Sequence, residues 1–281
     1  MHKYSRFFNE IFTSLMVISG PAMMHYLPYI KAYLENNFVD IPEREPLKLM
    51  IYDNIGIIPI QGVLTLSGSW VDPGTEEIAN VIQEAYDHSG VAAIVMPTHC
   101  YGGAVEAQFP MKEKLRKRNK PIISAVKGCS YSLGYLINAL TDKIYCVDKM
   151  CSVGSVGIVA SFTDDSKFWE EYKIKKITVY PPESDWKNLP QRKALEGDNS
   201  LLIKEELSPW AQYFQELVRE NRPNLNEAIE GTLQGRTFFA NYTDTNATMN
   251  GLIDGVMPMD EIIQYAFNLS TARKAKNFFN N

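Results

Sequence analysis

Short apolar runs alternate with amphipathic stretches through the middle of the chain. The continuous apolar runs at 55–60, 91–96 and 121–126 predict buried strands, because each is shorter than a helix and is bounded by glycine or proline. Between them, 75–87 and 104–118 predict helices, the first with acidic residues in its first turn and the second with a basic last turn. Strands and helices in this order predict a parallel sheet covered on both faces. The predicted fold class is α/β.

The pattern changes in the second half of the chain. A short helix is predicted at about 131–140, and further strands at 143–147 and 157–160. Beyond these strands the chain is predicted to be mostly helical. The helices expected there lie at 201–220, 225–233, 242–250 and 260–278.

Composition excludes several classes of protein. The 281 residues carry a net charge of −5, which argues against a basic nucleic-acid binder and gives no electrostatic attraction to anionic membranes. Four cysteines without a Cys-x-x-Cys pair indicate reduced thiols in a cytosolic setting. Four histidines without a His-x-x-x-His pair give no metal site. We therefore expect no metal and no cofactor.

The N-terminal region contains an apolar segment at 11–24. A membrane-spanning helix needs about 20 apolar residues, and this segment is shorter and is interrupted by Pro21. Lys3 and Arg6 form a weak basic flank, but no Ala-x-Ala cleavage site follows. We expect a soluble, helical arm here, with a membrane-associated segment as the alternative.

Two loops at the carboxyl ends of the predicted strands are candidates for chemistry. The loop at 97–103 ends in Gly102 and Gly103, whose backbone N–H groups could hold an oxyanion or a phosphate, or simply form a turn. The loop at 128–135 contains Ser130 and Ser132, and either serine could be a nucleophile or a helix N-cap. These two loops define the predicted site.

A serine nucleophile needs a base, and the sequence offers two. His99 lies in the first loop, although the preferred interpretation of this residue is a surface histidine. Lys187 lies in the polar loop 182–190. A lysine base must be neutral, so burial would have to lower its pKa from about 10.4 to roughly 7–8, at a cost of about 3–5 kcal/mol. Without such burial, Lys187 is an exposed lysine.

Five short motifs occur in an order that resembles the signal peptide peptidase A family of serine peptidases, including its phage capsid-maturation branch. The resemblance covers about residues 52 to 260. The motifs are Ile-Ile-Pro-Ile-Gln-Gly-Val-Leu at 57–64, Tyr-Gly-Gly at 101–103, Ser-Leu-Gly-Tyr at 132–135, Gly-Ser-Val-Gly at 154–157, and Gly-Arg-Thr-Phe at 235–238 followed by Ala247 and Gly-Leu-Ile-Asp at 251–254.

The resemblance implies a crotonase-like (Clp-protease-like) fold and a Ser–Lys dyad. Carried over by position, Ser132 is the nucleophile and Lys187 the general base, with Ser130 as a second candidate nucleophile. Gly102 and Gly103 match the oxyanion loop, which the Leu133 amide could complement. The domain organisation expected on this basis is an N-terminal arm at 1–50, a crotonase-like peptidase domain at 51–258 and a C-terminal helix at 259–281.

The resemblance also implies partners and a biological role. A peptide substrate is expected to bind as an extended strand beside the glycine pair, and the protein is expected to form a homo-oligomer. The preferred role is processing of portal or scaffold proteins in phage capsid assembly, in the cytoplasm or the procapsid, with no nucleic acid bound. The alternatives are a bacterial peptidase that degrades signal peptides, an acyl-CoA enzyme with Glu106 as base, and an inactive assembly subunit.

Overall fold

One mostly parallel sheet forms the centre of the protein. The computed structural model describes residues 16–18, 44–69, 72–161, 170–171, 173, 175 and 177–279. The main path through the sheet is β10-β7-β6-β5-β3-β2. Antiparallel pairing is confined to the periphery, where β2 pairs with β3, β8 with β9 and β1 with β5. The strands are β1 (Met16–Ile18), β2 (Met50–Tyr52), β3 (Ile55–Ile57), β4 (Ile60–Leu64), β5 (Ala93–Ala104), β6 (Ile122–Tyr131), β7 (Lys143–Cys146), β8 (Ser152–Gly154), β9 (Thr237–Phe239) and β10 (Gly255–Val256).

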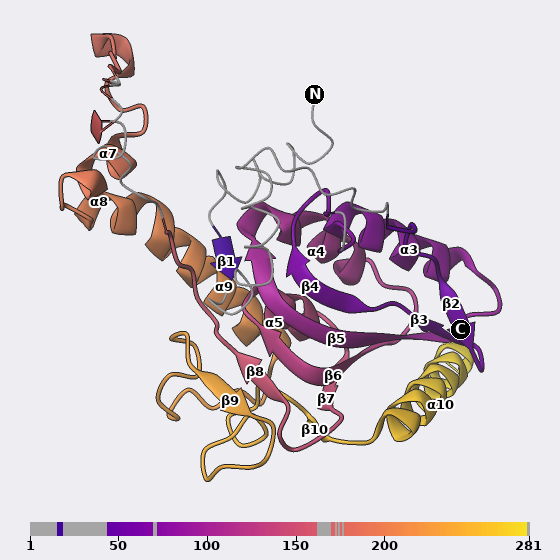
Figure 1. Cartoon of the computed structure of the whole chain (residues 1–281). Helices are drawn as coiled ribbons and strands as arrows, with labels where there is room; N and C mark the ends of the chain where they lie inside the picture. Colours follow the sequence, from indigo (N-terminus) through magenta and orange to yellow (C-terminus); the bar gives the residue numbers. More distant parts are fainter. Residues whose placement is uncertain are drawn as a thin grey trace.

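Helices cover both faces of this sheet (Figure 1). The helices α3, α4 and α5 lie on one face, and the long helix α10 lies on the other. A segment containing α7 and α8 projects away from the sheet, and α9 leads back towards α5. Their bounds are α3 (Thr75–Asp87), α4 (Gln108–Arg116), α5 (Leu133–Ala139), α7 (Leu189–Leu195), α8 (Ser200–Leu202), α9 (Ser208–Asn221) and α10 (Met259–Phe279), with 3₁₀ turns η1 (Val105–Ala107) and η2 (Pro182–Ser184) and a π-helical turn η3 (Ile203–Leu207).

The central strands are apolar on both sides because both sides are buried. In β5, Ile94 and Met96 pack into the core below α3, α4 and α5. The intervening residue Val95 faces the opposite way, together with Ile262 and Ala266 of α10. Side chains alternate between the two faces of a strand, so a strand buried on both faces has a continuous apolar sequence. The α/β class with a mostly parallel sheet is therefore confirmed.

Several predicted elements differ from the structure. Helix α3 covers the predicted range, and α10 nearly does, but residues 225–233 and 242–250 form turns rather than helices. In 225–233, Gly231 has a φ of 85° and Thr232 Oγ1 donates to the carbonyl of Ile229, and both features favour a turn over a helix. The strand predicted at 157–160 is absent, and β8 lies just before it.

The two central strands are longer than predicted. β5 continues through Pro97 to Ala104, and β6 continues to Tyr131, so most of the two predicted loops is strand. The helix predicted to start at 104 begins with η1 and becomes α4 at Gln108. The strand extensions are paired with β4, β1 and β8, which lie far from them in sequence. Local sequence cannot reveal such partners.

Of the predicted N-terminal arm at 1–50, the structure describes β1 and residues 44–50, the last of which begins β2. The β1 residues lie within the segment expected to be helical, and they form a strand instead. The rest of the predicted arm up to residue 43 is outside the described residues. Among the residues that are described, no helix combines the length and apolar character needed to cross a bilayer.

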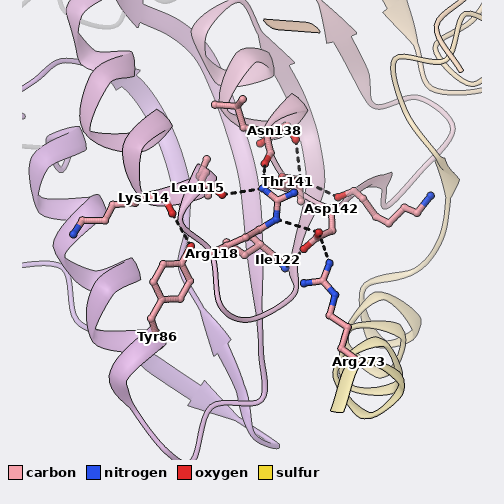
Figure 2. A network of polar contacts seen from close by, with 12 residues as sticks. Tyr86, Lys114, Leu115, Arg118, Ile122, Asn138, Thr141, Asp142 and Arg273 are labelled. Atoms are coloured by element: carbon pink, nitrogen blue, oxygen red, sulfur yellow. Dashed lines mark hydrogen bonds and ion pairs between the residues drawn. The ribbon is translucent and has the colours of Figure 1, made fainter. Parts of the chain in front are cut away.

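A polar network fastens α10 to the end of the sheet where β6 begins (Figure 2). The Asp142 carboxylate accepts a hydrogen bond from the Ile122 backbone N–H at 2.8 Å and pairs with Arg118 and Arg273. Arg118 also donates to the carbonyls of Leu115 and Leu140. One carboxylate therefore joins the end of α4, the start of β6 and the C-terminal helix.

Asp254 joins the C-terminal segment to the sheet in a similar way. Its carboxylate accepts hydrogen bonds from Lys143 Nζ, the Ile144 backbone N–H and Arg222 Nη1, each at 2.8 Å. Burial alone would raise the pKa of Asp254, but the Arg222 guanidinium and these hydrogen bonds lower it overall. Only 6% of the Arg222 side chain is exposed, so this cation depends on Asp254 for neutralisation.

The Asp254→Asn substitution is predicted to lower the free energy of unfolding by about 3 kcal/mol at pH 7, because it leaves the Arg222 charge buried without a counter-ion. Denaturant unfolding measures this loss, with Asp244→Asn, at an exposed site in the same segment, as the control. Since the pKa of Asp254 is lowered, its contribution is complete above the unfolded value of about 4 and disappears as the pH falls through the folded value. A denaturant midpoint for the Asp254→Asn protein equal to that of the wild type would contradict this prediction.

Candidate active site

Ser132 lies at the turn between β6 and α5, at the carboxyl end of a central strand. Its φ is 52° and its ψ is −117°, a conformation that residues with a side chain rarely adopt. The Ser132 backbone N–H donates to the carbonyl of Gly154 at 2.9 Å, and its own carbonyl accepts from the Leu136 N–H at 2.8 Å. A serine on a sharp, strained strand-to-helix turn is the arrangement that presents a nucleophile in other hydrolases.

The glycine pair lies on the neighbouring strand. Gly102 has a φ of 117°, and a side chain on Gly103 would place its Cβ 1.9 Å from the carbonyl oxygen of Leu64. Both positions therefore require glycine. β5 and β6 are parallel neighbours with Cys100 opposite Ser130, so the glycine pair near the end of β5 lies close to Ser132, which follows the end of β6. The structure thus brings the predicted oxyanion segment and nucleophile to the same edge of the sheet.

Close packing between β5 and α5 fixes this arrangement. A Cβ on Gly134 would lie 2.7 Å from Cys100 Sγ, so the first turn of α5 rests directly on β5. The next residue, Tyr135, is fully buried, and its hydroxyl donates to the Leu252 carbonyl at 2.8 Å. Glycine at 134 and tyrosine at 135 therefore have structural roles in the Ser-Leu-Gly-Tyr motif.

The position beside the glycine pair is occupied by the chain itself. β1 pairs with β5 in antiparallel fashion, with Val17 opposite Gly103 and Ile18 opposite Gly102. This is the place where the sequence predicted that an extended substrate would bind. The edge of β5 is therefore able to accept an added strand.

Lys187 is not in contact with Ser132 within this subunit. It follows η2 in the segment that carries α7, and its side chain is exposed. Its backbone N–H donates to the Ser184 carbonyl at 3.0 Å. No hydrogen bond or ion pair of its ammonium group occurs in the described part of the chain. The Ser132 hydroxyl faces the carbonyl of Gly157 at 3.5 Å.

The other candidates are engaged elsewhere. Ser130 is fully buried, and its hydroxyl accepts a hydrogen bond from Asn138 Nδ2 at 2.9 Å. His99 Nδ1 accepts from the Cys129 N–H at 3.4 Å, and its Nε2 lies 3.1 Å from the Tyr101 hydroxyl. Ser130 is thus part of the support beneath α5, which disfavours it as the nucleophile.

Sequence reasoning did not predict the roles of two groups of residues around Ser132. Gly154 and Gly157 place their carbonyls against the backbone and the hydroxyl of Ser132, and only the Gly-Ser-Val-Gly motif signalled them. The buried hydrogen bonds that link Thr98, Asn138 and Ser130 had no recognisable sequence signal. Among the described residues, no group of three or more His, Cys, Asp or Glu side chains is arranged to hold a metal ion.

Comparison with known families identifies the chain. The profile of Peptidase family S49 matches residues 114–273, which include Ser132 and more than half of the sequence. The chain belongs to peptidase family S49. The resemblance to signal peptide peptidases noted in the sequence is therefore confirmed.

A curated relative of this S49 chain comes from Enterococcus faecium and is named as a signal peptide peptidase, SppA. The two sequences are 25% identical over 209 residues, which is 69% of this chain. The aligned part spans 58% of the length of that relative.

Solved structures with a similar fold include Pseudomonas aeruginosa PA4980, with a TM-score of 0.50 at 13% identity over 83% of this chain and 87% of that one. The 1510-N membrane-bound stomatin-specific protease has a TM-score of 0.48 at 15% identity, over 78% and 84% of the two chains. An enoyl-CoA hydratase/isomerase family protein from Silicibacter pomeroyi has a TM-score of 0.48 at 12% identity, over 79% and 82%.

The strained backbone at Ser132 gives a prediction on stability. Ser132→Gly is expected to unfold with a free energy about 1 kcal/mol higher than Ser132→Ala, because glycine relieves the strain at positive φ. At ordinary strand and helix positions the order is reversed, with alanine more stable than glycine. Thermal or denaturant unfolding of the two variants measures the difference. Equal or lower stability for Ser132→Gly would show that this turn holds no strain.

Proposed function

We propose that this S49 protein is a serine endopeptidase in which Ser132 is the nucleophile and Lys187 the general base. The observation that carries the proposal is the strained turn at Ser132 beside the Gly102–Gly103 segment. A hydroxyl fixed at a strand end, next to backbone N–H groups, is suited to attack on a peptide carbonyl. The family membership supports the same chemistry.

The mechanism follows from these groups. Neutral Lys187 takes the proton from the Ser132 hydroxyl, and Ser132 Oγ attacks the carbonyl carbon of the scissile bond. The backbone N–H groups of Gly103 and Leu133 stabilise the oxyanion, joined by that of Gly102 when it leaves Cys100 Sγ, to which it donates at 3.4 Å. The protonated lysine then gives its proton to the leaving amine, and water hydrolyses the acyl-enzyme with the lysine again as base.

We infer that Lys187 reaches the serine of a neighbouring subunit. Lys187 is exposed on a segment that projects from the body of its own subunit, whereas a lysine base requires burial. The same segment exposes large apolar side chains that a second copy would cover. These are Ile177 at 74%, Val179 at 82%, Trp186 at 67%, Leu195 at 52% and Ile203 at 49% exposure. Formation of a homo-oligomer would bury this apolar surface and would at the same time remove the Lys187 side chain from water.

The substrate is proposed to bind as an extended strand on the edge of β5 that β1 now occupies. Main-chain hydrogen bonds to this edge would hold any sequence in register, and pockets beside Ser132 would select side chains. β1 then competes with substrate for the same backbone groups.

Two biological substrates fit an endopeptidase of this family. One is a portal or scaffold protein of a phage capsid, and the other is a cleaved signal peptide. The name of the Enterococcus faecium relative favours the second. Incubation with a synthetic signal peptide and with a purified capsid scaffold protein separates them, since only the true class should be cleaved at a kcat/KM well above that of casein.

A Ser132–Lys187 dyad formed between two subunits predicts that two inactive variants restore peptidase activity when they are combined. Ser132→Ala and Lys187→Ala should each hydrolyse a fluorogenic peptide at least about 1,000-fold more slowly than the wild type. After the two proteins are mixed under conditions that exchange subunits, activity should return, because some interfaces then combine an intact serine with an intact lysine.

The control is Lys193→Ala, which removes another lysine of the same segment and should keep full activity. Activity that stays absent in the mixture, when mass measurement shows mixed oligomers, would contradict a dyad shared between subunits. Full activity of Lys187→Ala alone would contradict the role of Lys187.

Deletion of residues 1–43 is predicted to increase kcat/KM for short peptide substrates several-fold, because it frees the edge of β5 from β1. Peptide hydrolysis by the shortened and full-length chains measures this effect, and circular dichroism checks that the fold is kept. An unchanged kcat/KM in a folded deletion variant would show that β1 does not compete with substrate.

A further inference from the structure

Strand β6 is irregular just before the proposed nucleophile. Its pairing with β5 is regular up to Thr98 and Val126, and the next paired residues are Cys100 and Ser130. Between these two pairs β5 has one residue, whereas β6 has the three residues 127–129. Such a β-bulge bends its strand and redirects the side chains that follow it, and bulges are frequent next to active sites.

This bulge decides which part of β5 lies level with Ser132. Before the bulge, paired residues of the two strands differ by 28 in residue number, and this register would bring Ser132 level with Ala104. After the bulge the difference is 30, which brings Ser132 level with Gly102, the first glycine of the proposed oxyanion segment. A shift of two residues along a strand moves the chain by about 7 Å. The proposed nucleophile and oxyanion donors therefore depend on the bulge for their relative position.

A buried asparagine bridges the two strands across the bulge. Asn138 lies on α5 and is fully buried, and its Nδ2 donates to Ser130 Oγ at 2.9 Å. Its Oδ1 accepts from Thr98 Oγ1 at 3.1 Å. Thr98 is in the last regular pair before the bulge, and Ser130 is in the first pair after it. One side-chain amide thus ties both sides of the bulge to the helix that begins after Ser132.

Asparagine is an unusual residue for this position in α5. Its helix propensity is low, and the adjacent residues Ile137 and Ala139 are apolar and fully buried. A buried amide is unfavourable unless its hydrogen bonds are made, but a complete network fixes a single arrangement of the groups that it joins. The two hydrogen bonds of Asn138 to the strands are therefore suited to holding the register of β6.

A second contact holds the bulge from the other face of β5. His99 follows Thr98, so its side chain points away from α5, and its Nδ1 accepts from the Cys129 backbone N–H at 3.4 Å. A Cβ on Gly128 would lie 2.6 Å from the same nitrogen, so the imidazole rests directly on the bulge. The bulge is thus held on both faces of the sheet.

We infer that Asn138 is a positioning residue, which fixes the bulge of β6 and thereby holds Ser132 level with the Gly102–Gly103 segment. Its amide contacts Thr98 and Ser130 and acts on the proposed nucleophile only through the backbone between them. The inference rests on the proposed peptidase function and adds a residue on which its chemical step depends. Substrate binding is assigned to the edge of β5, so loss of this amide should lower kcat and leave KM nearly unchanged.

Asn138→Leu replaces the amide by an apolar group of similar shape and tests the inference in the full-length protein. Hydrolysis of a fluorogenic peptide should show a kcat at least about tenfold lower and a KM within about twofold of the wild-type value, because a small displacement of a reacting group greatly slows the reaction. Thr98→Val, which removes one hydrogen bond at constant shape, should lower kcat in the same way. Thr98→Ser keeps the hydroxyl and should restore the wild-type kcat.

Ser124→Ala is the matched control for loss of a buried hydrogen bond in β6. Ser124 is fully buried before the bulge, and its hydroxyl lies 3.1 Å from Thr141 Oγ1. The control should be destabilised in denaturant unfolding, as Thr98→Val is, but should keep kcat within about twofold of the wild type. An equal loss of kcat in Ser124→Ala and Thr98→Val would mean that stability alone controls activity, and it would overturn the inference.

Amide hydrogen exchange separates failure of this inference from failure of the peptidase proposal. Asn138→Leu should raise the exchange rate of residues 127–135 by about tenfold or more, and Ser124→Ala should leave it unchanged. This result, with no peptide hydrolysis by the wild type, would uphold the role of Asn138 in fixing the bulge and reject the peptidase. Unchanged exchange, or a wild-type kcat in Asn138→Leu, would overturn the inference. If Asn138→Leu does not fold, the same measurements on Thr98→Val decide.

Discussion

The site depends on the strained backbone of Ser132. Its positive φ turns the chain from β6 directly into α5, and the hydrogen bond from its N–H to the Gly154 carbonyl holds that turn in place. The contact between Gly134 and Cys100 sets α5 directly on β5, so no residue with a side chain fits at that glycine. The positions of the proposed nucleophile and of the proposed oxyanion segment are then both consequences of two adjacent strand ends. Strain of this kind persists where the surrounding structure determines it.

The sequence predicted the layered architecture because each layer has a local signal. The range 75–87 has the amphipathic spacing of α3, and the apolar run in β5 reflects burial on both faces. The ends of the strands could not be predicted, since β5 and β6 are extended by pairing with strands distant in sequence. The helix predicted at 225–233 is absent from the structure. Gly231 at positive φ and Thr232, whose hydroxyl donates to a nearby backbone carbonyl, favour turns there.

The candidate site was predictable only in part. Glycines at 102 and 103 indicate close backbone contact on their own, but Ser132 could not be separated from Ser130 without the family resemblance. Both serines are buried, but the structure separates them: Asn138 holds the Ser130 hydroxyl in a hydrogen-bonded network, whereas Ser132 lies on the strained turn. Lys187 had no local signal beyond its residue type, and it lies exposed in the segment that carries α7.

The central claim is that Ser132 is the reactive hydroxyl of an S49 peptidase. Reaction of the full-length protein with a fluorophosphonate, followed by proteolytic mapping and mass spectrometry, tests it most directly. The account predicts a single phosphonyl adduct on Ser132, formed by the oligomer and abolished in Lys187→Ala. An unmodified Ser132 in an oligomeric protein, or an adduct mapped to Ser130, would contradict it.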